Sequence, residues 1–194
     1  MTDAAHHYET LLARHYTWMV GTEFGAKAGE QKALLEELGA KGQGLAIDLG
    51  SGPGYQAVAL AQLGFSPVLA VDMSEILLDE LGTHARGLPI KPVRGDIRDL
   101  AQLAAPGSAS AIVCMGDTLT HLESRADVSH LLADAHQALK PGGVLALTFR
   151  DLSIAVTQAA PFSSAAKLQK PFALTRSSTR APCNKARFRA MIVL

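Results

Sequence analysis

Three aspartates recur at intervals of 24 residues: Asp48, Asp72 and Asp96. A glycine-dense turn follows the first of them and contains Gly50, Ser51, Gly52 and Gly54. Glycine allows positive φ and lets a ligand approach the main chain where a side chain would block it. In dinucleotide-binding turns the backbone receives a pyrophosphate, which a carboxylate in front of the turn would repel. The pattern therefore favours a ligand with hydroxyls or a cationic group.

Strands alternating with helices would position these aspartates. Short apolar runs predict strands at residues 45–49, 67–71, 89–94, 109–115 and 144–149, and the intervening patterns predict helices at 55–63, 74–84 and 124–139. This alternation predicts a doubly wound α/β domain with a mostly parallel sheet. Charged residues follow all five strands at the edge where such sheets bind ligands, namely Asp48, Asp72, Asp96, Asp117 and Arg150.

The combined motifs resemble those of class I S-adenosylmethionine-dependent methyltransferases. The resemblance covers about residues 45–151. It rests on the glycine turn with its preceding acid, on Asp72 and Asp96, and on the Lys-Pro-Gly-Gly turn at 140–143. It implies a Rossmann-like fold with S-adenosyl-L-methionine as cofactor. The tail after the fifth strand departs from the family, which normally completes the sheet with a C-terminal hairpin.

The resemblance also implies a role for each motif residue. The turn would hold the methionine and ribose parts of the cofactor, with Asp48 near the methionine amino group. Asp72 would accept both ribose hydroxyls. Asp96 would accept from the adenine amine, with the Ile97 backbone beside the ring. A bidentate acceptor suits a cis-diol, and a carboxylate suits an N–H donor. Three further residues complete the predicted cofactor site: Ser51, Met73 and Met115.

Structural explanations compete with these roles. Asp72 could be an ordinary acid at a strand end, Asp96 could cap the helical turn at 97–103, and the glycines could form a purely structural loop. An NAD(P)-dependent oxidoreductase is the nearest functional competitor. Such an enzyme would keep an acid at the position of Asp72, but it would place a third glycine one residue later and no acid before the turn.

The loop after the fourth strand holds the candidates for chemistry. Together with Asp117, His121 could act as a base, although capping or packing is an alternative role for this histidine. Candidate acceptor-binding residues are Thr118 in the same loop, Arg150 at the fifth strand end, and Tyr16 and Trp18 in an N-terminal segment that resembles a lid. The aromatic pair would equally suit an amphipathic helix that packs on the sheet. The loop lacks the Asn/Asp-Pro-Pro-aromatic signature of nucleic-acid amine methylation, which leaves a small-molecule acceptor.

Composition narrows the class of protein. The 194 residues carry 18 basic and 18 acidic side chains, and this balance argues against an electrostatic nucleic-acid binder. We find no membrane-spanning run and no secretory signal, and two cysteines give no disulfide framework, so a cytoplasmic protein is expected. The histidines are too scattered to predict a metal site. Oligomeric state stays open.

Charge divides the chain unevenly. All 18 acidic residues lie within residues 1–151, whereas residues 152–194 carry seven basic residues and no acid. We therefore divide the chain into a helical lid segment (1–43), a cofactor-binding core (44–151) and an atypical basic tail (152–194). The tail shows no alternating strand pattern, and an altered C-terminus would leave the fifth strand poorly covered. A second hypothesis follows, namely a methyltransferase-like protein that binds the cofactor but is catalytically impaired.

Overall fold

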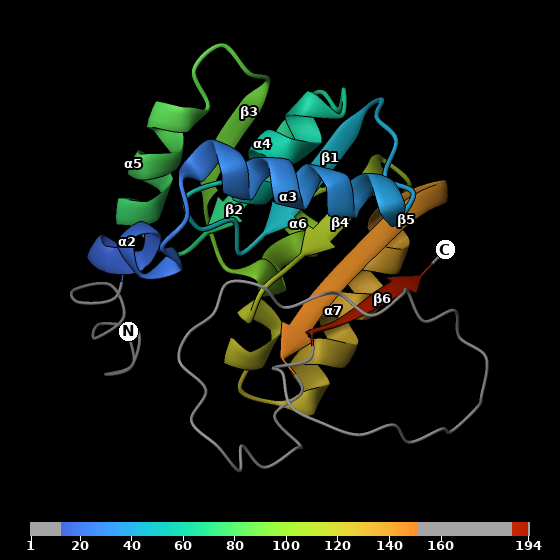
Figure 1. The fold of residues 1–194 in the computed structure, drawn as a ribbon. Coiled ribbons are helices and arrows are strands. Elements are labelled where there is room, and N and C mark those ends of the chain that lie inside the picture. Colours follow the sequence, from blue (N-terminus) through green and yellow to red (C-terminus); the bar gives the residue numbers. More distant parts are fainter. Residues whose placement is uncertain (1–12, 151–187, 194) are drawn as a thin grey trace, which may run out of the picture.

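The sheet at the centre of the molecule has six strands in the order β3-β2-β1-β4-β5-β6 (Figure 1). The structure is a computed structural model, and it describes residues 13–150 and 188–193. The first five strands run parallel and β6 runs antiparallel to β5. Their bounds are β1 Leu45–Leu49, β2 Val68–Asp72, β3 Ile90–Arg94, β4 Ala109–Cys114, β5 Leu139–Arg150 and β6 Phe188–Val193. The order reverses between β1 and β4, so the doubly wound α/β prediction is confirmed.

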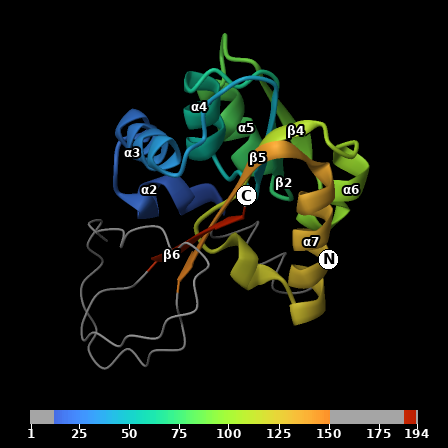
Figure 2. The same ribbon diagram turned by 90° about the vertical axis from the view of Figure 1, so that its right-hand side faces the viewer.

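Helices cover both faces of this sheet (Figure 2). One face packs against α3 (Phe24–Glu37), α4 (Tyr55–Gln62) and α5 (Glu75–His84), and the other against α6 (Leu100–Leu103) and α7 (Arg125–Ala138). Strand residues alternate between the two cores. Ala46 faces the first core and Ile47 the second, as the two-residue period of a strand requires. Both faces of the central strands β1 and β4 are therefore buried, and these strands are apolar almost throughout.

Side-chain caps fix two helix starts at the predicted places. The Ser74 hydroxyl accepts from the Leu77 amide at 3.3 Å, and α5 begins at the next residue. Ser124 and Asp127 form a reciprocal capping box at the start of α7. The cap residues thus define where the chain enters each helix after leaving the carboxyl edge of the sheet.

The end of the sheet differs from the sequence prediction. β5 begins at Leu139 rather than at 144, and its pairing with β4 shifts between Ala109 and Ala111, so that the predicted turn at 140–143 becomes an irregularity within the strand. The sequence predicted a poorly covered β5 without a normal C-terminal hairpin; in the structure β6 pairs with the outer edge of β5, from Leu145↔Val193 to Arg150↔Phe188. Apolar residues at 190–193 were enough for a strand once β5 offered an unpaired edge. Residues 152–187 and 194 of the basic tail lie outside the described residues.

The N-terminal segment lies at the carboxyl edge of the sheet. A 3-10 turn (Ala13–His15) leads into α2 (Tyr16–Val20), which Figure 1 shows beside the lower end of α5. The Thr17 hydroxyl donates to the Glu80 carboxylate of α5, and the Phe24 ring stacks on His84. These contacts hold α2 and the start of α3 on α5. Across the described ranges, every helix is too short or too polar to span a bilayer.

Candidate functional site

The glycine turn is bound tightly to the end of β2. The Gly50 and Ser51 amides donate to the Val71 carbonyl at 2.8 and 3.0 Å. The Gly52 amide donates to Oδ2 of Asp72 at 2.8 Å, and the other oxygen, Oδ1, accepts from the Ser74 amide at 2.9 Å. The turn and the second aspartate thus form one unit. A carboxylate with two acceptor oxygens matches the chemistry of a ligand with two adjacent hydroxyls.

Two glycines of the turn allow close packing that a side chain would prevent. Gly50, Gly52 and Gly54 have φ of +73°, +52° and +100°. A Cβ on Gly50 would lie 2.3 Å from Cγ2 of Thr118, and one on Gly54 would lie 2.0 Å from Cδ1 of Leu81. At Gly52 the nearest atom is 3.9 Å away. The first and third glycines therefore serve packing within the fold, whereas the second leaves its surroundings open.

Asp48 is a buried carboxylate with an unsatisfied oxygen. It is 1% exposed, and its Oδ2 atom has no hydrogen-bond partner among the described residues. Burial, with a smaller contribution from the Asp72 charge, raises the pKa of Asp48 to about 8, and the Ala57 amide opposes this shift. Such a group is costly to keep in the fold without a partner. A cationic donor bound in the site would satisfy it.

Asp96 follows β3, and its neighbour Arg98 contacts both of its carboxylate oxygens. Its Oδ1 accepts from the Arg98 amide at 2.9 Å, and both oxygens accept from the Arg98 guanidinium, with Nε at 3.0 and 2.9 Å. This hydrogen-bonded ion pair holds the pKa of Asp96 below its usual value. Asp96 thus caps the 3-10 turn Ile97–Asp99, which is the structural role considered as an alternative. The neighbouring Ile97 is buried at the same strand end.

The loop after β4 is held together by threonines. The Gly116 amide donates to Oγ1 of buried Thr148 on β5 at 2.7 Å. The Thr118 hydroxyl donates to the Met115 carbonyl at 3.1 Å, and the Thr120 hydroxyl donates to the Asp117 carbonyl at 2.6 Å. This network fixes Asp117 and Thr118 next to the glycine turn, where Thr118 meets Gly50.

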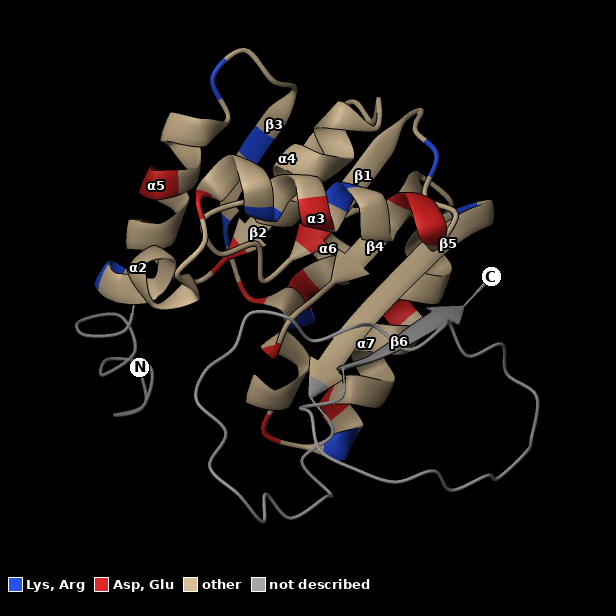
Figure 3. Ribbon diagram, viewed as in Figure 1, with Lys and Arg blue, Asp and Glu red and all other residues tan. Residues whose placement is uncertain are grey.

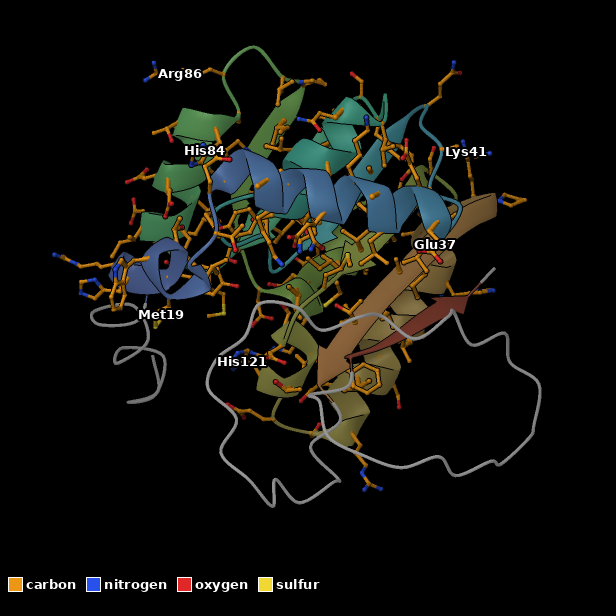
Figure 4. The ribbon with its side chains drawn as sticks, in the orientation of Figure 1. Met19, Glu37, Lys41, His84, Arg86 and His121 are labelled. Carbon is orange, nitrogen blue, oxygen red and sulfur yellow. The ribbon has the colours of Figure 1, made fainter. Side chains whose placement is uncertain are left out.

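His121 lies at the outer end of that loop. It is the last residue of the 3-10 turn Thr118–His121 and is exposed. Figure 4 shows the His121 side chain in the lower part of the molecule, on a turn that contacts the end of β5. Asp117, by contrast, is partly buried. The two candidate bases therefore occupy different depths of the same loop.

The two aromatic candidates of the N-terminal segment differ in their environment. Tyr16 is partly buried, and its ring is the nearest group to Gly52. Burial raises its pKa, and Tyr55, Asp117, Asp72 and Asp48 raise it further. Trp18 is 81% exposed. The fold therefore brings Tyr16 to the acidic site and directs Trp18 to solvent.

The remaining predicted residues lie around the same edge. Ser51 and Met115 are buried beside the turn and at the end of β4, whereas Met73 is 57% exposed. Arg150 is the last residue of β5, and only its backbone is described. Figure 3 shows acidic segments along this edge of the sheet and in the turn that leads into α7.

Sequence reasoning missed two residues of this edge. Thr148 is a polar residue near the end of an otherwise apolar strand. A polar residue at such a position indicates a hydrogen-bonding role, which Thr148 has with the Gly116 amide. Arg98 lies two residues after Asp96, a spacing at which a side chain folds back easily onto its neighbour. No cluster of three or more metal-ligating side chains occurs among residues 13–150.

The chemistry of this edge fits S-adenosylmethionine. Asp48 offers an unsatisfied buried oxygen to a cationic amino group, and Asp72 offers two oxygens to a cis-diol. The open surroundings of Gly52 let a ligand reach the main chain between them. Asp96 fits the base of the cofactor less directly, because Arg98 already occupies its oxygens.

Comparison with known proteins identifies the family. A methyltransferase-domain family model matches residues 46–143, about half of the chain. A glycine/sarcosine N-methyltransferase from Halorhodospira halochloris is 33% identical over 119 residues, which are 61% of this chain and 44% of that protein. A glycine/sarcosine/dimethylglycine N-methyltransferase from Actinopolyspora halophila is 31% identical over 124 residues, 63% of this chain and 22% of that protein. The chain thus spans less than half the length of these relatives.

Solved structures agree with this assignment. A proposed S-adenosyl-L-methionine-dependent methyltransferase from Methanococcus maripaludis superposes with a TM-score of 0.57 at 25% identity, over 70% of this chain and 61% of that one. One from Clostridium acetobutylicum gives a TM-score of 0.55 at 22% identity, over 75% and 56%, and supports the fold. The prediction of a Rossmann-like methyltransferase is confirmed, and the oxidoreductase alternative is not needed. This chain belongs to the class I methyltransferase-domain family, whose cofactor is S-adenosylmethionine.

Proposed function

We propose that this protein transfers a methyl group from S-adenosylmethionine to the amino nitrogen of a small amine of the glycine and sarcosine class. The observation that carries the cofactor part is the unsatisfied, buried Asp48 beside a glycine turn that Asp72 holds in place. The acceptor class is supported by the two N-methyltransferases that the chain resembles over about three fifths of its length.

The proposed cofactor residues divide by the part of the ligand they bind. Asp48 pairs with the amino group, Asp72 accepts from the ribose hydroxyls, and Asp96 with the Ile97 backbone receives the base. The remaining contacts come from the edges of the turn and of neighbouring strands: Gly50, Ser51, Gly52, Gly54, Met73 and Met115. When bound, the cofactor supplies an electrophilic methyl group on a sulfonium. The protein then has only to align the acceptor and exclude water from it.

The acceptor would bind over the loop that follows β4. Amines of this class are mostly protonated near neutral pH, so a base is needed before the nitrogen can react. Asp117, the more buried of the two candidate bases, would accept this proton. His121 could pass the proton to solvent, because this side chain is exposed on the same loop. Tyr16, Trp18 and Thr118 would surround the acceptor. Arg150, from its place at the end of β5, would bind an acidic group of the acceptor.

Calorimetry tests the cofactor assignment. S-Adenosylhomocysteine should give a binding heat and NAD should give none. Asp72→Ala should abolish that heat, because it removes both the diol acceptor and the anchor of the Gly52 amide. Asp79→Ala is the matched control, since it removes an exposed carboxylate from nearby α5. Binding of NAD in place of S-adenosylhomocysteine would contradict the assignment.

Turnover tests the acceptor. Labelled methyl incorporation should be measured with glycine, sarcosine and dimethylglycine, and with a pool of cell metabolites. Labelled glycine or sarcosine products are expected. Cofactor binding without any labelled product would instead support the second hypothesis, a methyltransferase-like protein that binds its cofactor without efficient chemistry.

A further inference from the structure

Arg98 engages both oxygens of the Asp96 carboxylate. Oδ1 accepts from the Arg98 amide and from Nε, and Oδ2 accepts from Nε and from a terminal guanidinium nitrogen. The single Nε hydrogen is shared between the two oxygens, so three N–H groups of Arg98 approach a carboxylate that provides about four lone-pair sites. A base amine that approaches Asp96 therefore competes with the guanidinium for the same two oxygens.

The ion pair is suited to opening. Side-chain exposure is 49% for Arg98 and 21% for Asp96, so water can replace either partner. Exposed ion pairs of this kind contribute little to stability. Arg98 also experiences the charges of Asp127 and Glu123 near the start of α7, both of which raise its pKa. The guanidinium therefore keeps acidic neighbours when it leaves Asp96, which lowers the cost of displacement.

We propose that Arg98 determines how the protein recognises the base of its cofactor, because its guanidinium competes with the base amine for the Asp96 carboxylate. This inference rests on the proposed role of Asp96. In the free protein Arg98 keeps Asp96 ionised and in place. On binding, an amino-bearing base displaces the guanidinium from at least one carboxylate oxygen.

The same competition affects which bases the site accepts. An adenine presents an amino group, which needs an acceptor and so competes with Arg98 for the Asp96 oxygens. A hypoxanthine presents a carbonyl oxygen at the same position, which needs a donor, and Arg98 supplies one without leaving Asp96. The Asp96–Arg98 pair therefore reduces discrimination between the two bases, whereas Asp96 alone would favour adenine.

Calorimetry with two ligands tests this inference. S-Adenosylhomocysteine and its inosine analogue should be titrated into the wild-type protein, Arg98→Ala and Arg98→Lys. For Arg98→Ala we expect about threefold tighter binding of S-adenosylhomocysteine and weaker binding of the inosine analogue, in keeping with the modest strength of an exposed ion pair. Arg98→Lys keeps the charge but loses the planar fork. Its affinities for the two ligands should lie between those of the wild type and those of Arg98→Ala.

Salt and a matched variant supply the controls. Salt screens the Asp96–Arg98 pair, so added sodium chloride should tighten S-adenosylhomocysteine binding to the wild type but not to Arg98→Ala. Arg94→Ala removes a guanidinium from the end of β3 that pairs with Glu75 instead, and it should leave the ratio of the two affinities unchanged.

Several outcomes would overturn the inference. If Arg98→Ala lowers the affinity for both ligands equally, Arg98 only supports Asp96 and does not compete with the base. If Asp96→Asn leaves both affinities unchanged while Asp72→Ala abolishes binding, Asp96 does not meet the base, although the proposed function stands. Failure of the wild type to bind S-adenosylhomocysteine would instead contradict the proposed function itself.

Discussion

The two halves of the carboxyl edge are built differently. On the β1–β2 side, main-chain amides of the glycine turn bond to Val71 and Asp72, and a buried aspartate lies beneath. On the β4–β5 side, the loop is held by threonine side chains and ends in an exposed 3-10 turn. The β1–β2 side is held by main-chain geometry. The β4–β5 side is held by side chains, each of which can be substituted separately.

This difference shows how one fold can keep a cofactor and change its acceptor. Backbone contacts depend on glycines whose φ values and close neighbours exclude other residues, so the cofactor half tolerates little change. Side-chain contacts in the loop after β4 can be altered one at a time without moving a strand. Function-specific variation is therefore expected in the second half.

The largest expected effect concerns Asp48 and the pH dependence of stability. Burial raises the pKa of Asp48 to about 8 in the folded protein, whereas the unfolded chain releases this proton near its ordinary pKa of 3.8. The free energy of unfolding should therefore fall as the pH rises between these values and level off above them. Each pKa unit contributes about 1.4 kcal/mol, so the decline from this residue amounts to several kcal/mol.

Urea unfolding of the wild type and Asp48→Asn from pH 5 to pH 9 measures this effect. The asparagine variant should be the more stable protein at high pH, and the difference should shrink toward low pH. Equal pH profiles for both proteins would show that the fold does not raise the pKa of Asp48.

Gly54→Ala should show the next largest effect. The added Cβ would lie 2.0 Å from Cδ1 of Leu81 at a φ of +100°, so we expect a loss of about 3 kcal/mol in the free energy of unfolding. Gly52→Ala, with its nearest atom 3.9 Å away, should lose only about 1 kcal/mol. Similar losses for both would contradict the distinction between packing and ligand-facing glycines.

Thr148→Val should weaken the acceptor half alone. Losing the hydroxyl leaves the Gly116 amide without its partner, at a cost of about 1–2 kcal/mol in unfolding free energy. Methyl transfer should slow while the affinity for S-adenosylhomocysteine stays unchanged, and Thr148→Ser should restore both. A fall in cofactor affinity would show that the two halves are not independent.

Trp18→Ala should have the smallest effect on the fold. Because Trp18 is 81% exposed, the free energy of unfolding should change by less than about 0.5 kcal/mol. If Trp18 contacts the acceptor as proposed, KM for the acceptor should rise without a change in cofactor affinity. An unchanged KM would leave Tyr16 as the aromatic contact of this segment.

Local sequence signals predicted several elements of the fold and the cofactor well. Apolar runs that end on acids placed β1 and β2, Ser74 and the Ser124–Asp127 box placed two helix starts, and the family motifs identified the cofactor. Each of these signals lies within a few residues of the feature it describes. Short-range patterns of this kind survive folding because the same local contacts form in the final structure.

Signals that depend on distant partners were missed. The β6 strand forms because the edge of β5 lies open to residues more than thirty positions away, and no local pattern at 188–193 reveals this. Thr148 acquires its role only when β5 lies beside β4. The ion pair of Asp96 with Arg98 is local in the sequence. The proposed competition between Arg98 and the cofactor base, however, becomes evident only when the contacts of Asp96 in the folded protein are known.

The contact between Gly50 and Thr118 links residues that different strands contribute. A methyl group at position 50 would occupy the volume of the threonine side chain, so the two positions should covary among homologues. A smaller residue at 118 would partly rescue Gly50→Ala. A change at position 118 that adapts the protein to a new methyl acceptor is therefore constrained by the size of the residue at position 50, even though position 50 belongs to the cofactor turn.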